Sequence, residues 1–199
     1  MSQSVFLAGL TAIGVLGSPT LSVASPAKPL HPTQVNLLKE VGISIVVPTY
    51  IPKGFSLSKL STEPCQPNTP RKNGVCQTRS GYRLLYRNSE NTCFAVYGNF
   101  TRGIGGGGSG FSFPVTTKIL GKTFISFGRS TNYEDKVPSE KQLNSVQQNI
   151  WSFPIYQKGT PIIYGIRTIE NEEDCWENRS LTPLEMAKIF ESLGWLSRL

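Results

Sequence analysis

Residues 81–100 read GYRLLYRNSENTCFAVYGNF, and this stretch decides the class of fold. Residues 81–88 and 92–100 alternate their side chains with the period of two that is typical of β-strands, which places Arg83 and Arg87 on one face and tyrosines on the other. The Asn-Ser-Glu-Asn between the two runs has the composition of a tight turn. The stretch therefore predicts an antiparallel hairpin with one basic face and one apolar face.

Further strands are predicted on both sides of this hairpin. They cover residues 55–60, 111–120, 123–129, 151–157 and 160–170, with a turn at 121–122. Three helices are predicted over residues 33–41, 139–150 and 183–193. Strands outnumber helices and short turns join them, which favours an α+β domain. We expect an antiparallel β-sheet with the N- and C-terminal helices packed on one face and disulfides as staples.

The last helix has the clearest boundary signals. Thr182 is placed to cap it, Pro183 occupies the first helical position, and Glu185 completes the pattern of a capping box. The first helix has a candidate cap in Thr33.

The N-terminus has the pattern of a secretory signal peptide. Residues 5–17 are thirteen apolar or small residues without a charge, and the Ser-Val-Ala that ends at Ala24 suits signal peptidase. We expect a signal peptide over residues 1–24, a flexible tail over 25–32 and a single domain over 33–199. The apolar run is shorter than the roughly 20 residues of a transmembrane helix, so no span is expected after cleavage. The expected locations are the periplasm, the thylakoid lumen or the extracellular space.

Cysteine usage agrees with export. Four cysteines form an even set, which indicates two disulfides in an exported chain. Three pairings are open, and we favour Cys65–Cys76 and Cys93–Cys175. The first would close a polar loop, and the second would join a middle strand to the C-terminal helical region. The chain has no C-x-x-C pair, so neither a metal site nor a free thiol is expected.

Charge is distributed unevenly along the chain. Residues 28–133 carry 13 Lys and Arg against 3 Glu, whereas residues 134–199 carry 7 against 10 Asp and Glu. The basic part has two interpretations. Either it attracts the protein to anionic surfaces, or it is a solvated face that keeps the protein soluble. The candidate anion-binding face consists of Arg79, Arg83, Arg87 and Arg102.

The candidate partners of this face are an anionic lipid, an envelope polymer or an acidic protein. Nucleic acid is not expected, because the chain is exported and because Tyr82 and Tyr86 lie on the face opposite Arg83 and Arg87. A stacking platform needs aromatic and basic side chains on one face.

Catalytic and cofactor motifs are incomplete. Residues 103–108 match G-x-G-x-x-G, but a strand pattern with Pro114 follows them, whereas a dinucleotide site needs a helix. A serine–histidine hydrolase needs a histidine, and the single His31 lies in the proline-rich tail. The acidic residues around Glu172 and Asp174 lack the spacing of a calcium loop. We therefore expect no cofactor, no metal and no catalytic residue.

Four segments together carry a family resemblance. They are PTYIPKGF (48–55), GYRLLYRN (81–88), TCFAVYGNFTRGIGG (92–106) and LTPLEMAKIFESL (181–193). On these segments the chain resembles a group of small exported cyanobacterial proteins of unknown function, over most of residues 45–196. It departs from their pattern at residues 99–102, before the glycines. PTYIPKGF and the closing helix also resemble, more distantly, an uncharacterised domain found after some bacterial anti-sigma factors. Neither resemblance implies a catalytic residue.

These observations predict an exported, non-catalytic binding or envelope-associated protein. Two alternatives stay open: a sensor or lipid-handling module with an apolar groove between sheet and helices, and a hydrolase of unknown type. A flat basic face would favour the first function, a deep apolar cavity the second, and a cleft with two convergent carboxylates the third.

Overall fold

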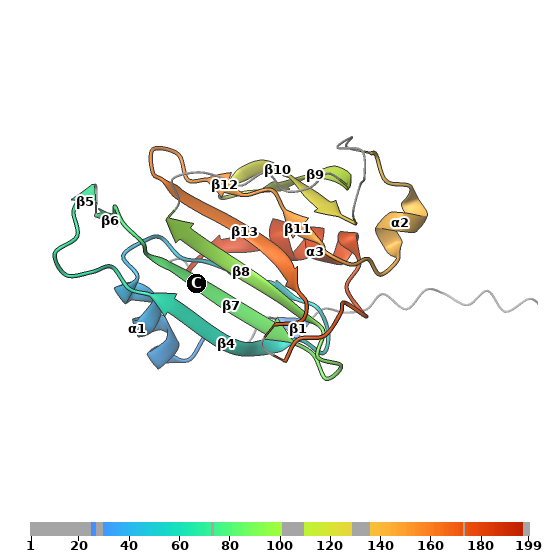
Figure 1. Cartoon of the computed structure of the whole chain (residues 1–199), viewed down its shortest axis with the longest axis horizontal. Helices are drawn as coiled ribbons and strands as arrows, with labels where there is room; N and C mark the ends of the chain where they lie inside the picture. Colours follow the sequence, from blue (N-terminus) through green and yellow to red (C-terminus); the bar gives the residue numbers. More distant parts are fainter. Residues whose placement is uncertain are drawn as a thin grey trace, which may run out of the picture.

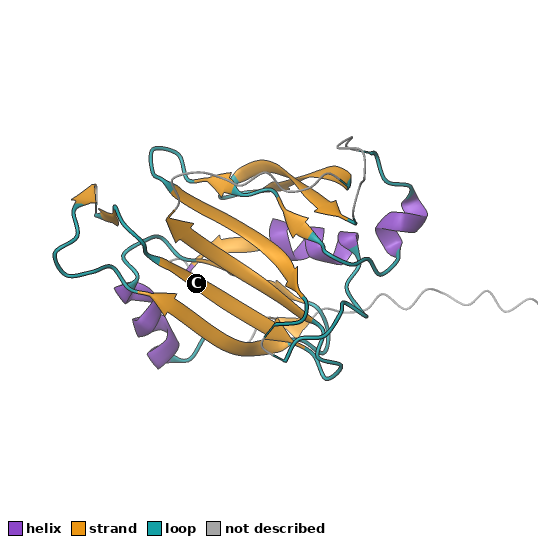
Figure 2. Ribbon diagram, in the orientation of Figure 1, coloured by secondary structure: helices purple, strands orange, loops and turns teal. Residues whose placement is uncertain are grey.

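The chain is organised around one large sheet. The computed structural model describes residues 25–26, 30–72, 74–100, 110–128, 136–172 and 174–196. The predicted signal peptide, Arg102 and the glycine-rich residues 103–109 lie outside these ranges. Within the described ranges the fold is mostly antiparallel β-sheet with three short helices and two disulfides (Figure 2).

The largest sheet has eight strands (Figure 1). Its path is β4 (Ser56–Glu63), β7 (Gly81–Arg87), β8 (Cys93–Phe100), β13 (Ile162–Ile169), β11 (Trp151–Ser152), β10 (Gly121–Phe127) and β9 (Phe111–Thr117), and β12 (Ile155–Tyr156) pairs with β13. Three two-stranded sheets pair β1 (Ser25–Pro26) with β3 (Tyr50–Ile51), β2 (Val46–Pro48) with β14 (Leu193–Trp195), and β5 (Arg71–Lys72) with β6 (Val75–Cys76). The central β8–β13 pair joins segments that are far apart in the sequence.

β7 and β8 form the hairpin predicted from residues 81–100. Asn88 holds its turn, because the side-chain Oδ1 accepts hydrogen bonds from Glu90 N at 3.0 Å and from Thr92 N at 2.9 Å. An Asn that bonds the backbone two residues ahead is a frequent turn former. The local pattern was therefore sufficient to predict this hairpin.

The β9–β10 hairpin turns earlier than the sequence predicts. The prediction placed the turn at residues 121–122, whereas the structure places it at 118–120 and begins β10 at Gly121. Thr117 Oγ1 accepts a hydrogen bond from Leu120 N at 2.8 Å and so closes this turn. Gly121 has a φ of 90°, which glycine adopts without steric cost, so it marks the exit from the turn.

Helix α1 (Pro32–Glu40) begins one residue before the predicted start. Its N-cap is His31 and not Thr33, because the His31 ring accepts from Thr33 N and Gln34 Oε1 accepts from His31 N at 2.8 Å. Proline suits the first helical position, where its missing N–H has no partner to lose. The predicted tail over residues 25–32 thus contributes β1 and the start of α1.

Helix α2 (Glu140–Asn144) is shorter than the predicted helix over residues 139–150. The predicted capping box forms, but Ser145 adopts an extended conformation and ends the helix. Ile150 is fully buried, and its N–H donates to Thr168 Oγ1 at 3.0 Å. Packing of this segment against the sheet therefore overrides the helical pattern after the first turns.

Helix α3 (Pro183–Glu191) begins where the sequence predicts. Thr182 Oγ1 accepts a hydrogen bond from Glu185 N at 3.1 Å. The second half of the predicted capping box does not form. Instead the Glu185 carboxylate accepts a hydrogen bond from Tyr50 Oη at 3.5 Å and lies 3.8 Å from Lys188 Nζ in the same helix.

One hydrophobic cluster joins the helices to the large sheet. Leu38 from α1 and Phe190 from α3 are fully buried in the same cluster as Leu84 of β7. Tyr86 stacks on Phe94 with ring centroids 4.8 Å apart. Burial of a side chain such as Phe94 stabilises the fold by about 1.5–3 kcal/mol. The even-numbered side of β7 is therefore interior, and the side that carries its arginines is the outer face of the sheet.

The two disulfides are Cys65–Cys76 and Cys93–Cys175, the pairing favoured from the sequence. The first closes the loop that carries β5 and β6. The second joins β8 to the loop that follows β13. The second disulfide therefore determines which part of the outer face that loop covers.

Candidate functional site

The outer face of the sheet has a covered half and an open half. The loop that contains Cys175 covers one half, where Cys93 and Cys175 are buried together with Leu85, Ala95 and Ile169. The open half is hollowed into a groove of about 710 Å³, which we call the outer groove. Its lining includes Ser61, Glu63, Arg83, Tyr97, Asn99 and Arg167.

Two glycines create room on this face. A Cβ atom at Gly81 would overlap the Asn99 side chain on the neighbouring strand. At Gly165 a Cβ atom would lie 2.7 Å from Cζ of Tyr97, so the phenol ring lies across the bare backbone of β13. A side chain at either position would displace a residue that lines the groove, so the groove depends on both glycines.

Arg83 and Arg167 approach the groove from two strands that do not pair with each other. Arg83 lies on β7 and Arg167 on β13, with β8 between them. Both guanidinium groups contact the carboxylate of Glu172, at 3.3 Å from Arg83 Nη1 to Oε2 and 3.8 Å from Arg167 Nη2 to Oε1. The side chains of Arg83, Arg167 and Glu172 are 22%, 48% and 51% exposed. The three charges therefore form a bridged ion pair that is open to solvent.

Tyr97 lines the same groove as the two arginines. It is the cross-strand neighbour of Arg83 on β8, and its other neighbour is Gly165 on β13. Burial raises the pKa of the Tyr97 phenol, and the positive charge of Arg167 opposes part of that rise. The phenol is therefore neutral at ordinary pH and can donate a hydrogen bond.

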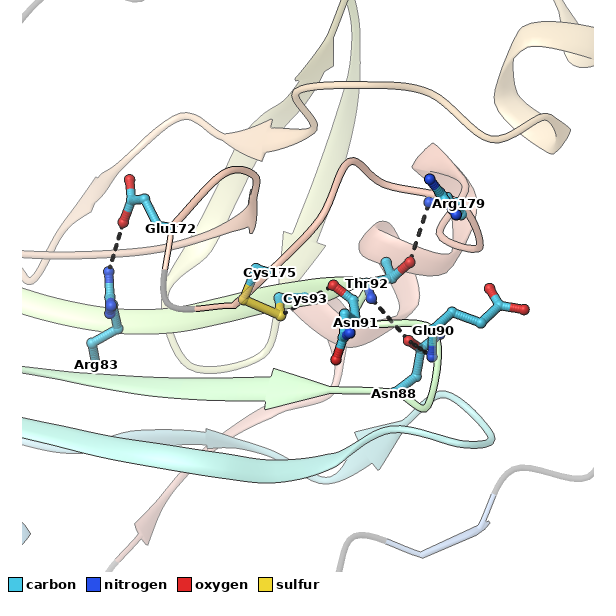
Figure 3. The surroundings of a disulfide bond; sticks show 9 residues. All are labelled: Arg83, Asn88, Glu90, Asn91, Thr92, Cys93, Glu172, Cys175 and Arg179. Carbon is cyan, nitrogen blue, oxygen red and sulfur yellow. Dashed lines mark hydrogen bonds and ion pairs between the residues drawn. A yellow bond between two sulfur atoms is a disulfide. The ribbon is translucent and has the colours of Figure 1, made fainter.

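The loop that carries Glu172 is held at several points (Figure 3). Besides the Cys93–Cys175 bond, Trp176 N donates to Asn91 O at 2.8 Å and Arg179 N donates to Thr92 Oγ1 at 3.2 Å. Figure 3 shows Glu172 reaching from this loop toward Arg83. The β7–β8 turn and the loop are therefore one connected unit, and this unit positions the Glu172 carboxylate over the arginines.

The structure separates the arginines that the sequence grouped. Arg83 lines the outer groove. Arg87 lies at the far end of the same strand, opposite Cys93. Arg79 is exposed ahead of β7, and Arg102 lies outside the described residues.

Sequence reasoning missed Arg167, Tyr97 and Glu172 as members of a site. Alternation in IIYGIRTI, residues 162–169, was the available signal, because it places Arg167 and Gly165 on one face. No sequence feature in or near that strand identifies β8 as its partner. Tyr82 lies on the face opposite Arg83, as predicted, but Tyr97 brings an aromatic ring onto the arginine face.

A second groove of about 630 Å³ lies where α1 meets the C-terminal segment. Its lining includes Val35, Lys39, Ile43, Ile45, Trp195 and Leu196. Ser44 and Gln157 also line it, so the lining mixes apolar and polar groups, with the one cation Lys39 among its residues.

Other kinds of site were sought in the same described ranges. There, no group of three or more His, Cys, Asp or Glu side chains is placed to hold a metal ion. In those ranges no helix combines the length and apolar character needed to cross a membrane. Comparison of the chain with protein families, curated proteins and solved structures found no match. The functional argument therefore rests on the chemistry of the grooves.

Proposed function

We propose that this chain is an exported, non-catalytic binding protein that engages anionic groups through the outer groove. The observation that carries the proposal is that Arg83 and Arg167, which both line an open groove, converge on one carboxylate. Guanidinium groups bind carboxylates and phosphates with charge-assisted hydrogen bonds, and they keep their charge at any physiological pH.

Export is supported by the signal-peptide pattern and by the two disulfides, which persist in oxidising compartments. The proposed location is the periplasm, the thylakoid lumen or the extracellular space. In the proposed α+β arrangement, α1 and α3 cover the same face of the sheet and leave the outer face to the ligand. The shared hydrophobic cluster of Leu38, Leu84 and Phe190 supports this arrangement.

Binding is favoured over catalysis by the groups that the groove offers. Besides the single carboxylate of Glu63, the lining offers guanidinium, phenol, amide and hydroxyl groups, which recognise anions and hydroxyls. The chain has a single histidine, His31, and it caps α1, so a serine–histidine pair does not form in the outer groove.

The test measures binding of the purified, disulfide-bonded protein to anionic vesicles and to polygalacturonate. We expect binding to at least one of these two probes, and this binding should weaken between about 0.1 M and about 1 M salt, where the screening length falls from about 10 Å to about 3 Å. The double variant Arg83→Gln/Arg167→Gln should lose most of this binding. The charge-matched control is Lys118→Gln/Lys122→Gln, at the remote β9–β10 turn. Absence of binding to every anionic probe, or an equal loss in the control, would contradict the proposal.

A lipid-handling function is the second candidate, and the groove beside α1 favours it. Ile43, Ile45 and Trp195 line that groove, whose volume suits an acyl chain. A fluorescent fatty acid should then bind the protein and be displaced by oleate. Ile45→Gln should weaken this binding and leave binding to anionic polymer unchanged. Failure of the fatty acid to bind would eliminate this candidate.

A further inference from the structure

We propose that the ligand of the outer groove is a carboxylate-bearing polysaccharide, and that Glu172 occupies the position of one of its carboxylates. This inference rests on the proposed function and names the ligand class of the same site. It depends on three features of the described residues: how loosely Glu172 is held, what surrounds the arginines, and the shape of the groove.

The Glu172 carboxylate is held at longer distances than a strong ion pair. Its contacts to Arg83 and Arg167, at 3.3 Å and 3.8 Å, exceed the roughly 2.7–2.9 Å of a well-formed charge-assisted hydrogen bond. Half of the Glu172 side chain is exposed, and exposed ion pairs contribute little to stability. An external carboxylate can therefore displace Glu172 from the two guanidinium groups at small cost.

The surroundings of the arginines suit a sugar ring. Tyr97 offers a flat, neutral ring in the same lining as Arg83 and Arg167, and Asn99 lies two residues further along β8 on the same face, about 7 Å away. Glu63 and Ser61 on β4 line the same groove. Amide, carboxylate and hydroxyl groups bind sugar hydroxyls as donors and acceptors.

The shape and polarity of the groove favour a polysaccharide over a membrane surface. The arginines lie in a hollow of the sheet, and Glu63 and Glu172 flank them with negative charge. A flat anionic membrane would meet these carboxylates together with the arginines and be repelled by them. A chain with carboxylates at intervals can place one charge on the arginines and its neutral ring atoms elsewhere in the groove.

The experiment measures binding of tetragalacturonate to the disulfide-bonded protein by calorimetry, with maltotetraose as the uncharged control. We expect tetragalacturonate to bind and maltotetraose to bind at least tenfold more weakly. Arg83→Gln and Arg167→Gln should each lower the affinity about tenfold. Arg87→Gln, on the same face but away from the groove, should change it less than twofold. Tyr97→Ala should weaken binding more than Tyr97→Phe, because the second variant keeps the ring.

Glu172→Gln gives the sharpest readout. If Glu172 occupies the carboxylate position, this variant should raise the affinity for tetragalacturonate up to about fivefold, the factor that corresponds to about 1 kcal/mol. An unchanged or lower affinity would show that Glu172 only supports the loop and would overturn the inference. The urea midpoints of all variants show whether each one is folded.

The outcomes separate this inference from the function on which it rests. Binding to anionic vesicles without binding to tetragalacturonate would overturn the ligand class and leave the anion-binding function standing. An equal effect of Arg87→Gln and Arg83→Gln would indicate diffuse attraction and would also overturn the groove as the site. Absence of binding to any anionic probe would refute both proposals.

Discussion

Removal of the Cys93–Cys175 disulfide should destabilise the protein more than removal of the Cys65–Cys76 disulfide. The two bridges span 82 and 11 residues. The loop-closure entropy that a bridge removes from the unfolded chain corresponds to about 4.5 kcal/mol for the longer loop and about 2.8 kcal/mol for the shorter one. The longer bridge also holds the loop that buries Leu85, Ala95 and Ile169, so its loss exposes apolar surface as well.

The assay compares urea unfolding of Cys93→Ala/Cys175→Ala with that of Cys65→Ala/Cys76→Ala, followed by tryptophan fluorescence. Alanine is used because these positions are buried and a serine hydroxyl would lack a partner there. The slope of the unfolding free energy against urea should also rise more in the first variant, because its unfolded chain becomes more expanded. A larger loss in the short-bridge variant, or a loss below about 1 kcal/mol in the long-bridge variant, would refute the chain-entropy reasoning.

Three further predictions concern the core and the last helix. The free energy of unfolding should fall as the pH rises above about 10. Burial raises the pKa of Tyr82, Tyr86 and Tyr164 above 10.0. In this pH range the folded chain therefore retains protons that the unfolded chain releases. Equal urea stability at about pH 8 and about pH 11 would contradict this. Gly98→Ala should lower the free energy of unfolding by about 1–3 kcal/mol in the same assay. The added Cβ would lie 2.6 Å from the Tyr82 ring and 2.8 Å from the Tyr164 ring. An unchanged free energy of unfolding would show that the rings move. Thr182→Ala should cost about 0.5–2 kcal/mol by loss of the α3 cap, and Thr182→Ser should restore it.

Local patterns predicted the elements whose stability is mainly local. The β7–β8 hairpin followed from period-two alternation and an Asn turn, and α3 followed from Thr182 and Pro183. The prediction for α2 was wrong because a tertiary contact competed with a local signal. Helix α2 ends early because Ile150 is buried against the sheet, although its sequence continues the helical pattern. Helix α1 begins early because His31 supplies a cap that composition alone does not indicate.

The outer groove was only partly predictable. Alternation placed Arg83 on the face opposite Tyr82, and it did so correctly. The other members come from strands and loops whose neighbours are set by long-range pairing. A shift of β13 by one residue against β8 would turn Arg167 to the face opposite Tyr97, and the amino-acid pattern of a single strand does not exclude that shift.

The sequence by itself determined the β-rich character of the chain and which side of β7 is basic. It favoured one of three disulfide pairings, and the structure has that pairing. These depend on side-chain periodicity and on spacing along the chain, which are local properties. Only the tertiary structure decided that Tyr97 lies across Gly165 and that Arg83 and Arg167 both contact the carboxylate of Glu172. The physical reason is that strand order and register are set by the packing of the whole core, so residues far apart in the sequence become neighbours only when the sheet has closed.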